Sequence, residues 1–557
     1  MSTTRVLTAE QMQKVDAETI ARVVPGLELM ERAGRGVVKA IFARFGAPRA
    51  DGHHAAIFVG PGNNGGDGLV VARLLIEAGW ACSIHLLKSG RECTPDTAKN
   101  YQRLLEMPRV RDSRAGALRE FEAARSDWIA QAGDDLRDAT LLVDSIFGTG
   151  FSGAPRDRAA EMIALINQTA TKHHLPVVSI DIPSGVNGTT GEIGGEAVHA
   201  TLTVTIGAAK TGLLFHPGRA HVGDLTVIDI GFPPDIVEAH AGAVFLLDQQ
   251  AAASKLPRRA PDIHKYGAGT VLLIAGSERY RGAALLAAEA ALRGGCGMVY
   301  LAVPEGIHRE VSMGLREAIV VPLPRTDEGT IAPAAREILA PYINKADAVA
   351  IGPGLGRHDE TDMFVREFVR ASTRPMVVDA DGLTAFAGHA AEFARAKAPV
   401  VITPHDGELA RLTGEAIPTA ALERIAYSSK TARDLGVTLV HKGAPTLVAG
   451  RTGEIWINAS GNSALAKGGT GDVLTGLIAG FLAQGFARMR RSTQPAAGEP
   501  ATAESAQALD AACVACFLHG RAGEIVAGTR GLRGVVAGDL LGALGPAMVA
   551  LETTAGS

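Results

Sequence analysis

Residues 467–476 read Lys-Gly-Gly-Thr-Gly-Asp-Val-Leu-Thr-Gly and combine closely spaced glycines with one acid. An apolar run of helical length, Val473–Phe481, comes next, and Gln484-Gly485 is typical of a helix end. Gly469–Gly471 would then lie at the helix N-terminus, where free N–H groups and the positive end of the helix dipole can hold a phosphate or an oxyanion. Asp472 beside them could accept a proton from a hydroxyl group. The alternative is a helix that Asp472 only caps.

Polar, glycine-rich loops follow three predicted strands in the first half of the chain. These loops begin at Gly60, Asp144 and Asp181. Because the carboxyl ends of parallel strands meet at one edge of a sheet, Asn64, Asp144, Asp181 and Ser184 could converge there. A single aspartate after a strand is more often a cap than a catalyst, but three such loops favour a site. Lys210 follows a further strand and either faces this site or is solvated.

The first of these loops also fits a different reading. Residues 60–65 match the Gly-x-Gly-x-x-Gly fingerprint of dinucleotide-binding folds. A hydride-transferring dehydrogenase is disfavoured, however, because the next strand ends at Lys88 where an acidic residue should bind ribose. The loop carries Asn63, Asn64 and Asp67, whose oxygen atoms suit an alkali-metal ion or polar ligand groups.

The Asn-Asn-Gly-Gly-Asp-Gly and Asp-Ile-Pro-Ser-Gly strings together resemble the NAD(P)H-hydrate epimerase domain, over about Val6–Phe232. The resemblance implies potassium bound by Asn64, Asp144 and Ser184, and it makes Asp181 the acid/base at the hydrated ring carbon. It implies that the hydrated nicotinamide nucleotide contacts Asn63, Asn64, Gly65, Gly66, Asp67, Gly148, Thr149, Gly150, Phe151, Ser152, Gly153, Ala154 and Asp181.

Alternating strand and helix patterns restart after a proline-rich stretch near residues 234–245, which predicts two α/β domains, 1–238 and 239–557. The first is expected to be a Rossmann-like three-layer sandwich and the second another α/β sandwich. Residues 258–265 are predicted to lie over the second site. Residues 488–508, rich in Ser, Thr, Pro, Ala and Glu, are predicted to form a mobile insertion between two helices.

Further loops in the second half, Gly352–Gly356, Thr403–Glu408 and Lys442–Thr446, precede Gly468–Asp472. In this order they resemble the ADP/ATP-dependent NAD(P)H-hydrate dehydratases, a branch of the ribokinase-like fold, over about residues 245–550. The resemblance implies that the hydrated substrate contacts Ala283, Gly354, His405 and Asp472. It implies that the adenine nucleotide contacts Lys442, Gly443, Ala444, Pro445, Thr446 and Gly471.

The two resemblances together imply repair of damaged NADH and NADPH. The first domain would interconvert the R and S hydrates, and the second would dehydrate the S form with Asp472 as the base. ADP or ATP, with ADP favoured, would donate the phosphoryl group together with Mg²⁺. The alternatives are a ribokinase-type kinase acting on a small molecule such as a vitamin precursor, and a first domain that binds nucleotide without catalysis.

Composition excludes several classes of function. With 557 residues, a formal net charge of −4 and 4% aromatic residues, the chain is not expected to bind nucleic acid. No apolar run of about 18 residues indicates a membrane span. Its five scattered cysteines indicate reduced thiols and a cytoplasmic location, with Cys513 and Cys516 packed in a core. A homo-oligomer is expected.

Overall fold

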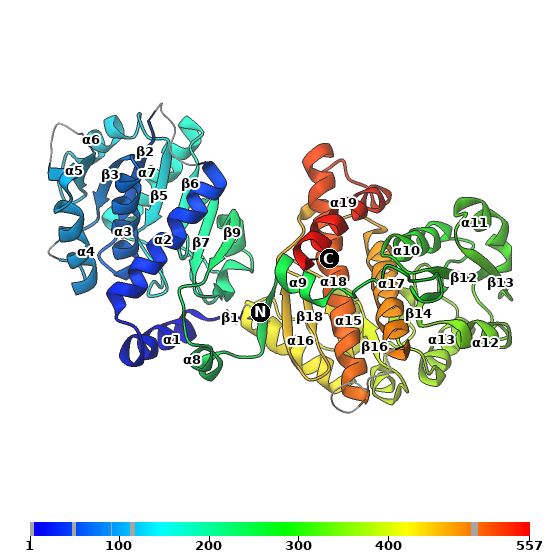
Figure 1. Ribbon diagram of the computed structural model, residues 1–557. Coiled ribbons are helices and arrows are strands. Elements are labelled where there is room, and N and C mark those ends of the chain that lie inside the picture. The colour runs from blue at the N-terminus through cyan, green and yellow to red at the C-terminus, as the bar shows by residue number, and fades with distance from the viewer. Residues whose placement is uncertain (1–4, 47–51, 91, 112–116, 492–499, 557) are drawn as a thin grey trace. The chain divides into compact units, whose positions relative to one another are not determined.

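The computed structural model describes residues 5–46, 52–90, 92–111, 117–491 and 500–556 (Figure 1). The chain divides into two compact units, with the boundary between Val244 and Phe245. Helix α8 (Pro234–His240), in which the sequence placed the boundary, packs against α1 (Ala9–Arg22) and so belongs to the first unit. None of the helices in the described ranges is long and apolar enough to cross a membrane.

The first unit is built on a parallel sheet in the order β4-β3-β2-β5-β6-β7-β9. Its strands are β2 (His54–Val59), β3 (Ala81–Leu86), β4 (Leu118–Glu122), β5 (Leu141–Ser145), β6 (Val177–Ile180), β7 (Leu202–Ile206) and β9 (Asp224–Ile228). A separate two-stranded sheet pairs β1 (Val6–Leu7) with β8 (Ala209–Lys210). Strand order reverses between β2 and β5, which is where ligands bind in open α/β sheets.

Helices cover both faces of this sheet. One face shares a core with α2 (Gly26–Phe45) and α3 (Asn63–Glu77), and the other with α6 (Trp128–Asp135) and α7 (Asp157–His173). Alternate residues of β2 serve the two cores, with Ile57 on one side and Phe58 on the other. The predicted three-layer sandwich is therefore confirmed. Helix α4 (Pro95–Leu105) packs on α3 and contributes Leu104 to the first of these cores, and the short helix α5 (Pro108–Arg111) follows it.

The second unit is built on a larger sheet, in the order β10-β19-β18-β17-β16-β15-β14-β11-β12-β13. Pairing is parallel from β13 to β17, and the β17-β18-β19 meander is antiparallel. Its strands are β10 (Val244–Leu247), β11 (Thr270–Ile274), β12 (Met298–Pro304), β13 (Ile319–Leu323), β14 (Ala348–Ile351), β15 (Met376–Val378), β16 (Val400–Ile402), β17 (Thr438–His441), β18 (Leu447–Ala449) and β19 (Ile455–Asn458).

Small residues bring the main helices of this unit close together. The helices are α9 (Gln249–Lys255), α10 (Arg281–Arg293), α11 (His308–Gly314), α12 (Ala335–Lys345), α13 (Asp359–Ala371), α14 (Asp381–Thr384), α15 (Asp406–Thr413), α16 (Ala421–Leu435), α17 (Thr470–Arg491), α18 (Pro500–Arg530) and α19 (Ala537–Ala555). A β-carbon on Gly476 of α17 would lie 2.0 Å from the carbonyl oxygen of Ala287 in α10. Helices α10, α17, α18 and α19 therefore form one core against the sheet.

Two helix boundaries differ from the sequence prediction. The prediction that α17 ends at Gly485 is wrong, because the helix continues to Arg491. Gly485 is a packing residue, since a β-carbon there would lie 2.2 Å from the side chain of Gln507 in α18. Helix α18 begins at Pro500, so much of the segment predicted as an insertion is helical, in keeping with its alanine content. Residues 492–499 lie outside the described residues.

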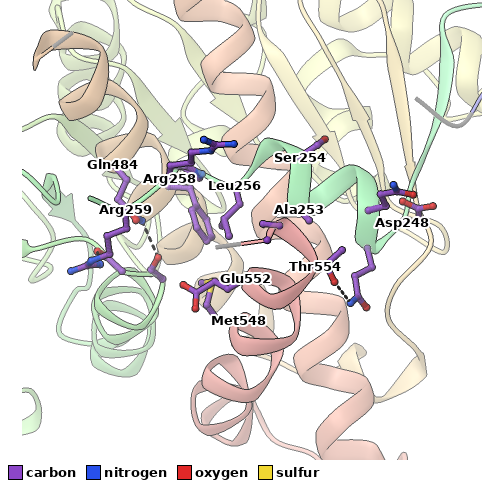
Figure 2. Close-up of a pocket in the computed structure, with 18 of the residues that line it drawn as sticks. Asp248, Ala253, Ser254, Leu256, Arg258, Arg259, Gln484, Met548, Glu552 and Thr554 are labelled. Carbon is purple, nitrogen blue, oxygen red and sulfur yellow. Dashed lines mark hydrogen bonds between the residues drawn. The ribbon is translucent and has the colours of Figure 1, made fainter. Parts of the chain in front are cut away.

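The segment predicted to cover the second site lies elsewhere. Arg258 and Arg259 line a separate cavity of about 1240 Å³ between α9 and the C-terminal ends of α10 and α19 (Figure 2). Arg259 donates a hydrogen bond of 2.9 Å to the carbonyl oxygen of Gly295, which precedes β12. The segment therefore lies at the amino ends of the strands. The predicted catalytic loops are at the opposite, carboxyl ends.

Candidate active sites

A cavity of about 680 Å³ opens at the carboxyl edge of the first sheet. The loops after β2, β5 and β6 contribute to its wall, and so do residues of α1 and α2. The predicted site residues that line it are Asn63, Asn64, Asp67, Gly148, Thr149, Gly150, Phe151, Ser152 and Asp181. The loops after β2, β5 and β6 thus meet at one cavity, as expected from the strand order. On its wall the rings of Phe147 and Phe151 stack with centroids 4.5 Å apart.

Four predicted substrate residues do not line the cavity: Gly65, Gly66, Gly153 and Ala154. A β-carbon on Gly65 would lie 1.9 Å from the carbonyl oxygen of Gly60, and one on Gly66 would lie 2.6 Å from the sulfur of Met30. These two glycines therefore allow α3 to begin tightly against β2 and α2. Of the fingerprint glycines, Gly60 and Gly65 are therefore required by packing, whereas a β-carbon on Gly62 would meet nothing within 4 Å.

Asp181 and Lys210 form a buried ion pair at the floor of the cavity. Lys210 is 1% exposed, so its reading as a solvated lysine is wrong. Its ammonium group donates to Asp181 Oδ1 and, at 2.7 Å, to the carbonyl oxygen of Ile206. Asp181 has φ of +67°, a left-handed conformation that costs energy for a residue with a side chain. This strained backbone is typical of a functional residue.

Two further carboxyl groups line the same cavity as Asp181. Asp67 lies in the first turns of α3, and Asp16 comes from α1, where the sequence predicted a helix but no site residue. Burial, followed by the negative charges of Asp181 and Asp16, raises the pKa of Asp67 well above its usual range. Burial and the charge of Asp181 likewise raise the pKa of Asp16. The charge of Lys210 opposes these shifts, but burial and the neighbouring carboxylate outweigh it at both acids.

The three predicted potassium ligands are connected through Phe147. Asn64 Nδ2 donates to the carbonyl oxygen of Phe147 at 2.8 Å, while Phe147 N donates to Ser184 Oγ at 2.9 Å. Ser184 Oγ in turn donates to Asp144 Oδ1 at 2.5 Å. Asn64 Oδ1 is buried and has no hydrogen-bond partner among the described residues. Burial raises the pKa of Asp144, although Ser179 and Ser184 donate hydrogen bonds to it. An unpartnered amide oxygen beside a buried carboxyl group fits a bound monovalent cation.

In the second unit, α17 begins at Thr470, which confirms the predicted helix N-terminus. Gly469 has φ of +89°, and a β-carbon there would lie 2.9 Å from the side chain of Leu286. Asp472 lies in the first turn of the helix. Burial raises its pKa to about 7, and the neighbouring charge of Asp379 acts in the same direction. This carboxyl group can therefore accept a proton near neutral pH.

Several of the other predicted residues of this site lie next to one another, although they come from different loops. A β-carbon on Gly354, which has φ of +62°, would lie 2.9 Å from that of Ala283. His405 and Lys442 form a parallel backbone bridge between adjacent loops. A β-carbon on Gly471 would lie 3.6 Å from the Nζ atom of Lys442. Thr446 Oγ1 donates to the carbonyl oxygen of Gly443 at 3.1 Å within the loop that begins at Lys442. The structure thus brings Gly354 to Ala283, and both His405 and Gly471 to Lys442.

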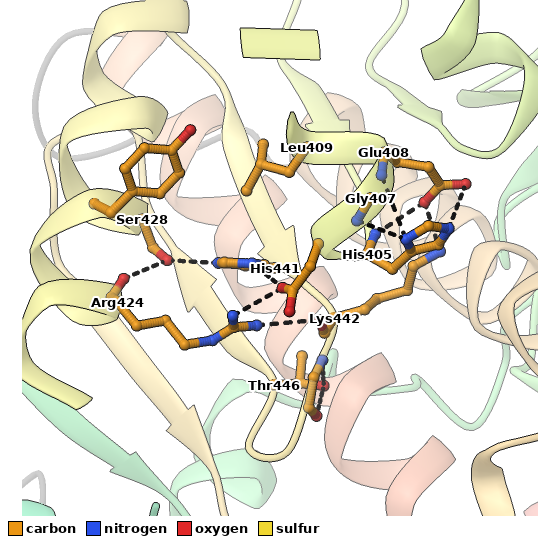
Figure 3. Close-up of polar contacts among 12 residues, drawn as sticks. His405, Gly407, Glu408, Leu409, Arg424, Ser428, His441, Lys442 and Thr446 are labelled. Atoms are coloured by element: carbon orange, nitrogen blue, oxygen red, sulfur yellow. Dashed lines mark hydrogen bonds and ion pairs between the residues drawn. The ribbon is translucent and has the colours of Figure 1, made fainter. Parts of the chain in front are cut away.

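His405 is the N-cap of α15. Its Nδ1 atom accepts hydrogen bonds from the backbone N–H groups of Gly407 (3.0 Å) and Glu408 (3.3 Å) (Figure 3). The Glu408 carboxylate accepts at 2.9 Å from the backbone N–H of His405, which completes a capping box. Nδ1 is thereby committed to the cap, and Nε2 lies 3.6 Å from Glu408 Oε1, so both ring nitrogens face the first turn of α15.

A polar network supports the loop that begins at Lys442. Asp406 accepts hydrogen bonds of 2.8 Å from both Arg424 and His441. Arg424 also donates to the carbonyl oxygen of Lys442 at 3.3 Å, and Ser428 bonds the other nitrogen of His441 (Figure 3). Burial, followed by the charge of Arg424, lowers the pKa of His441 to about 4. His441 is therefore neutral and acts as a structural link. The sequence contained these residues but no signal for their connection.

Comparison with known proteins agrees with this division of the chain. Residues 26–212 match the family described as YjeF-related protein N-terminus, and residues 271–544 match NAD(P)H-hydrate dehydratase. A bifunctional NAD(P)H-hydrate repair enzyme of Moorella thermoacetica is 37% identical over 537 residues, which is 96% of this chain and 95% of that protein. The chain belongs to the family of bifunctional NAD(P)H-hydrate repair enzymes.

Other relatives extend the same picture. The repair enzyme of Salinibacter ruber is 37% identical over 543 residues, covering 96% of this chain and 94% of that protein. Among solved structures, an ADP/ATP-dependent NAD(P)H-hydrate dehydratase of Bacillus subtilis, co-crystallized with ATP/Mg²⁺, is 30% identical. It covers 55% of this chain and 98% of its own, with a TM-score of 0.44.

Proposed function

We propose that this protein restores hydrated NADH and NADPH. The first unit interconverts the R and S hydrates, and the second dehydrates the S form with an adenine nucleotide as phosphoryl donor. The observation that carries the proposal is the position of Asp472, at the N-terminus of α17 and next in the chain to Gly471, which adjoins Lys442. A base, free N–H groups and a cation at one point are what phosphoryl transfer to an alcohol requires.

Dehydration begins when Asp472 takes the proton of the ring hydroxyl. The hydroxyl oxygen then attacks the terminal phosphorus, and the bond from that phosphorus to the rest of the nucleotide breaks. The N–H groups at the start of α17 and the ammonium of Lys442 stabilise the negative charge on the transferring group. The electron pair of the ring nitrogen then expels phosphate, and loss of a proton from the neighbouring ring carbon restores the double bond.

Epimerisation needs an acid and a base on the hydrated ring carbon. Asp181, paired with Lys210, provides a carboxylate that can activate water, and Asp67 opposite it in the cavity provides a neutral acid. Protonation of the departing hydroxyl and re-addition of water from the other side invert the configuration. The stacked rings of Phe147 and Phe151 offer an apolar surface for the nicotinamide ring.

Both domains would use inorganic cations. Potassium would be held by Asn64, Asp144 and Ser184, where it would balance the buried carboxyl group and fix the loops of the first site. In the part of the chain that the structure describes, no group of three or more His, Cys, Asp or Glu side chains could hold a metal ion. This favours Mg²⁺ that arrives on the phosphates of ADP or ATP, where it would neutralise part of their charge.

We further propose a cytoplasmic protein that forms a homo-oligomer and prefers ADP. The cysteines support the location, because Cys82, Cys93, Cys296, Cys513 and Cys516 are all free thiols. Among the described residues, Val549 and Met313 are large apolar side chains exposed by 63% and 79% on the second unit, as expected where subunits meet.

A repair assay tests the proposed function. The protein is incubated with a mixed pool of hydrated NADH and either ADP or ATP, and the absorbance of reduced nicotinamide and the release of orthophosphate are followed. Recovery of both epimers supports both activities, and recovery of half the pool supports the second alone. A stable phosphorylated product without NADH would indicate the alternative, a small-molecule kinase. No nucleotide-dependent recovery would reject the proposal.

A further inference from the structure

Asp379, at the end of β15, contacts both α17 and the loop that begins at Lys442. Neither the sequence analysis nor the proposed reaction gives it a role. It directly follows β15, and its side chain is 2% exposed. Oδ1 accepts a hydrogen bond of 3.0 Å from Lys442 Nζ, and Oδ2 accepts one of 2.6 Å from Thr475 Oγ1 in α17. The carboxylate therefore ties the catalytic helix to the loop that begins at Lys442.

The backbone of Asp379 is held as firmly as its side chain. Its N–H donates to the carbonyl oxygen of Ile351 at 3.1 Å, and its own carbonyl accepts from Gly382 N at 2.9 Å. Gly352 leaves just enough room, because a β-carbon there would lie 1.8 Å from the Asp379 carbonyl oxygen. A carboxylate fixed at both backbone and side chain is suited to orient another group, since little freedom remains to be lost.

The group that Asp379 orients is the ammonium of Lys442. Glu408 lies 3.6 Å from the same nitrogen, so two carboxylates hold it from different loops. A β-carbon on Gly471 would lie 3.6 Å from Lys442 Nζ and 3.8 Å from Asp379 Oδ2. The ion pair therefore lies beside the first turn of α17, where the free N–H groups of the helix accept an anion.

We propose that Asp379 is a positioning residue for phosphoryl transfer, holding the Lys442 ammonium at the N-terminus of α17 to receive the terminal phosphate of the nucleotide. This inference rests on the proposed function of the second unit and names a residue on which that function depends. Asp379 itself touches neither substrate nor nucleotide. Thr475 fixes the second oxygen of Asp379 and thereby sets the direction in which Lys442 is held.

Electrostatics support this assignment. Burial alone would lower the pKa of Lys442, but the charges of Asp379 and Glu408 outweigh it and raise the pKa, so the ammonium stays charged. Asp379 also acts on the base, because its charge adds to burial in raising the pKa of Asp472 to about 7. Removal of the Asp379 charge would therefore weaken nucleotide binding and, separately, make Asp472 a weaker base that ionises at lower pH.

The test is Asp379→Asn, with Asp381→Asn as a matched control. Asp381 also raises the pKa of Asp472 but accepts its hydrogen bond from Gly356 N, at 2.9 Å. Nucleotide KM and the pH dependence of kcat are measured on the full chain with the S hydrate. Asp379→Asn should raise the nucleotide KM roughly 10- to 100-fold, as expected for loss of a charged hydrogen bond. It should also move the acidic limb of the pH profile to lower pH.

The control separates the two effects. Asp381→Asn should also move the acidic limb to lower pH, because Asp381 raises the pKa of Asp472. It should leave the nucleotide KM within about twofold of wild type. Thr475→Val, which keeps the Asp379 charge, should raise the KM without moving the limb, and it serves if Asp379→Asn does not fold. An unchanged nucleotide KM in both Asp379→Asn and Thr475→Val, in an otherwise active enzyme, overturns the inference. An inactive wild type would instead contradict the proposed function.

Discussion

The two active sites place a lysine differently relative to the catalytic carboxylate. In the first unit Lys210 binds Asp181 itself, and the pKa of the neighbouring Asp67 stays raised although the charge of Lys210 opposes the shift. In the second unit Lys442 binds Asp379 and Glu408, and the catalytic Asp472 has no such partner within the described ranges. In the first site the lysine is paired with the proposed base. In the second site the lysine is paired with other carboxylates, the pKa of the base is raised to about 7 by burial, and the ammonium lies beside the helix N-terminus that would receive phosphate.

The largest effects are expected from replacing the catalytic carboxylate of each site, because each one should serve a single reaction. Asp472→Asn should lower dehydration by roughly 10²- to 10⁴-fold, the usual contribution of a general base, and leave epimerisation unchanged. Asp181→Asn should do the reverse. Both rates are measured on each variant, from recovery of NADH and from the ratio of R to S hydrates. A variant that loses both activities would show that the two sites are not independent.

The ion pair of the first site predicts the next largest effect. Lys210→Met leaves the carboxylate of Asp181 buried without a partner, so epimerisation should fall by roughly 10²-fold or more. The first unit should also lose about 3–5 kcal/mol of stability, measured by denaturant unfolding. The double variant Lys210→Met/Asp181→Asn should regain most of that stability but no activity. If the single variant is as stable as wild type, the pair is not buried as described.

The unpaired base of the second site predicts a pH effect of intermediate size. Asp472 must be ionised to accept a proton, and burial raises its pKa to about 7. Dehydration should therefore be about tenfold slower at pH 6 than on its alkaline plateau. Epimerisation, measured over the same range, should follow a different curve. A flat dehydration profile between pH 6 and 8 would contradict the role given to burial.

Besides the loss of epimerisation expected when its acid group is removed, Asp67 predicts a smaller effect on stability. Its pKa is raised in the folded protein, so the folded state disfavours the charge that the unfolded chain carries above about pH 4. The stability contributed by neutral Asp67 is present at low pH and is lost as pH rises toward its folded pKa. Asp67→Asn should remove this dependence and raise Tm at pH 7 by roughly 2–4 °C for each kcal/mol, with a smaller gain at pH 5. An equal rise in Tm at pH 5 and pH 7 would show that the charge of Asp67 does not destabilise the folded protein.

Residues at the ends of central strands were the most predictable from sequence. Asp144 and Asp181 were identified because polar residues after apolar runs converge in a parallel sheet. The structure places Asp181 in the cavity wall, and Asp144 is buried and bonded to Ser184. Asp379 follows a predicted strand in the same manner, so the same signal was available and was not used. Strand β18 was expected after the loop that ends at Thr446, but the edge strand β13 and the last meander strand β19 were not predicted, since both are short.

Contacts between distant segments were not predictable in the same way. Nothing in the helix that carries Asp16 indicates that this residue faces the cavity, because its orientation depends on the packing of α1. Lys210 could not be distinguished from a solvated lysine until the position of β8 was known. Gly65, Gly66 and Gly485 resembled ligand-binding or helix-ending glycines, but each one relieves a close approach of neighbouring segments.

The most direct test follows the oxygen of the ring hydroxyl through the second reaction. The S hydrate of NADH is labelled with ¹⁸O at that hydroxyl and incubated with ADP and the Asp181→Asn variant, which should not exchange the label through epimerisation. If the hydroxyl attacks phosphorus, the released orthophosphate carries one labelled oxygen for each NADH formed. Unlabelled orthophosphate, with the label in water, would show that nucleotide hydrolysis and loss of the hydroxyl are separate events and would contradict the account.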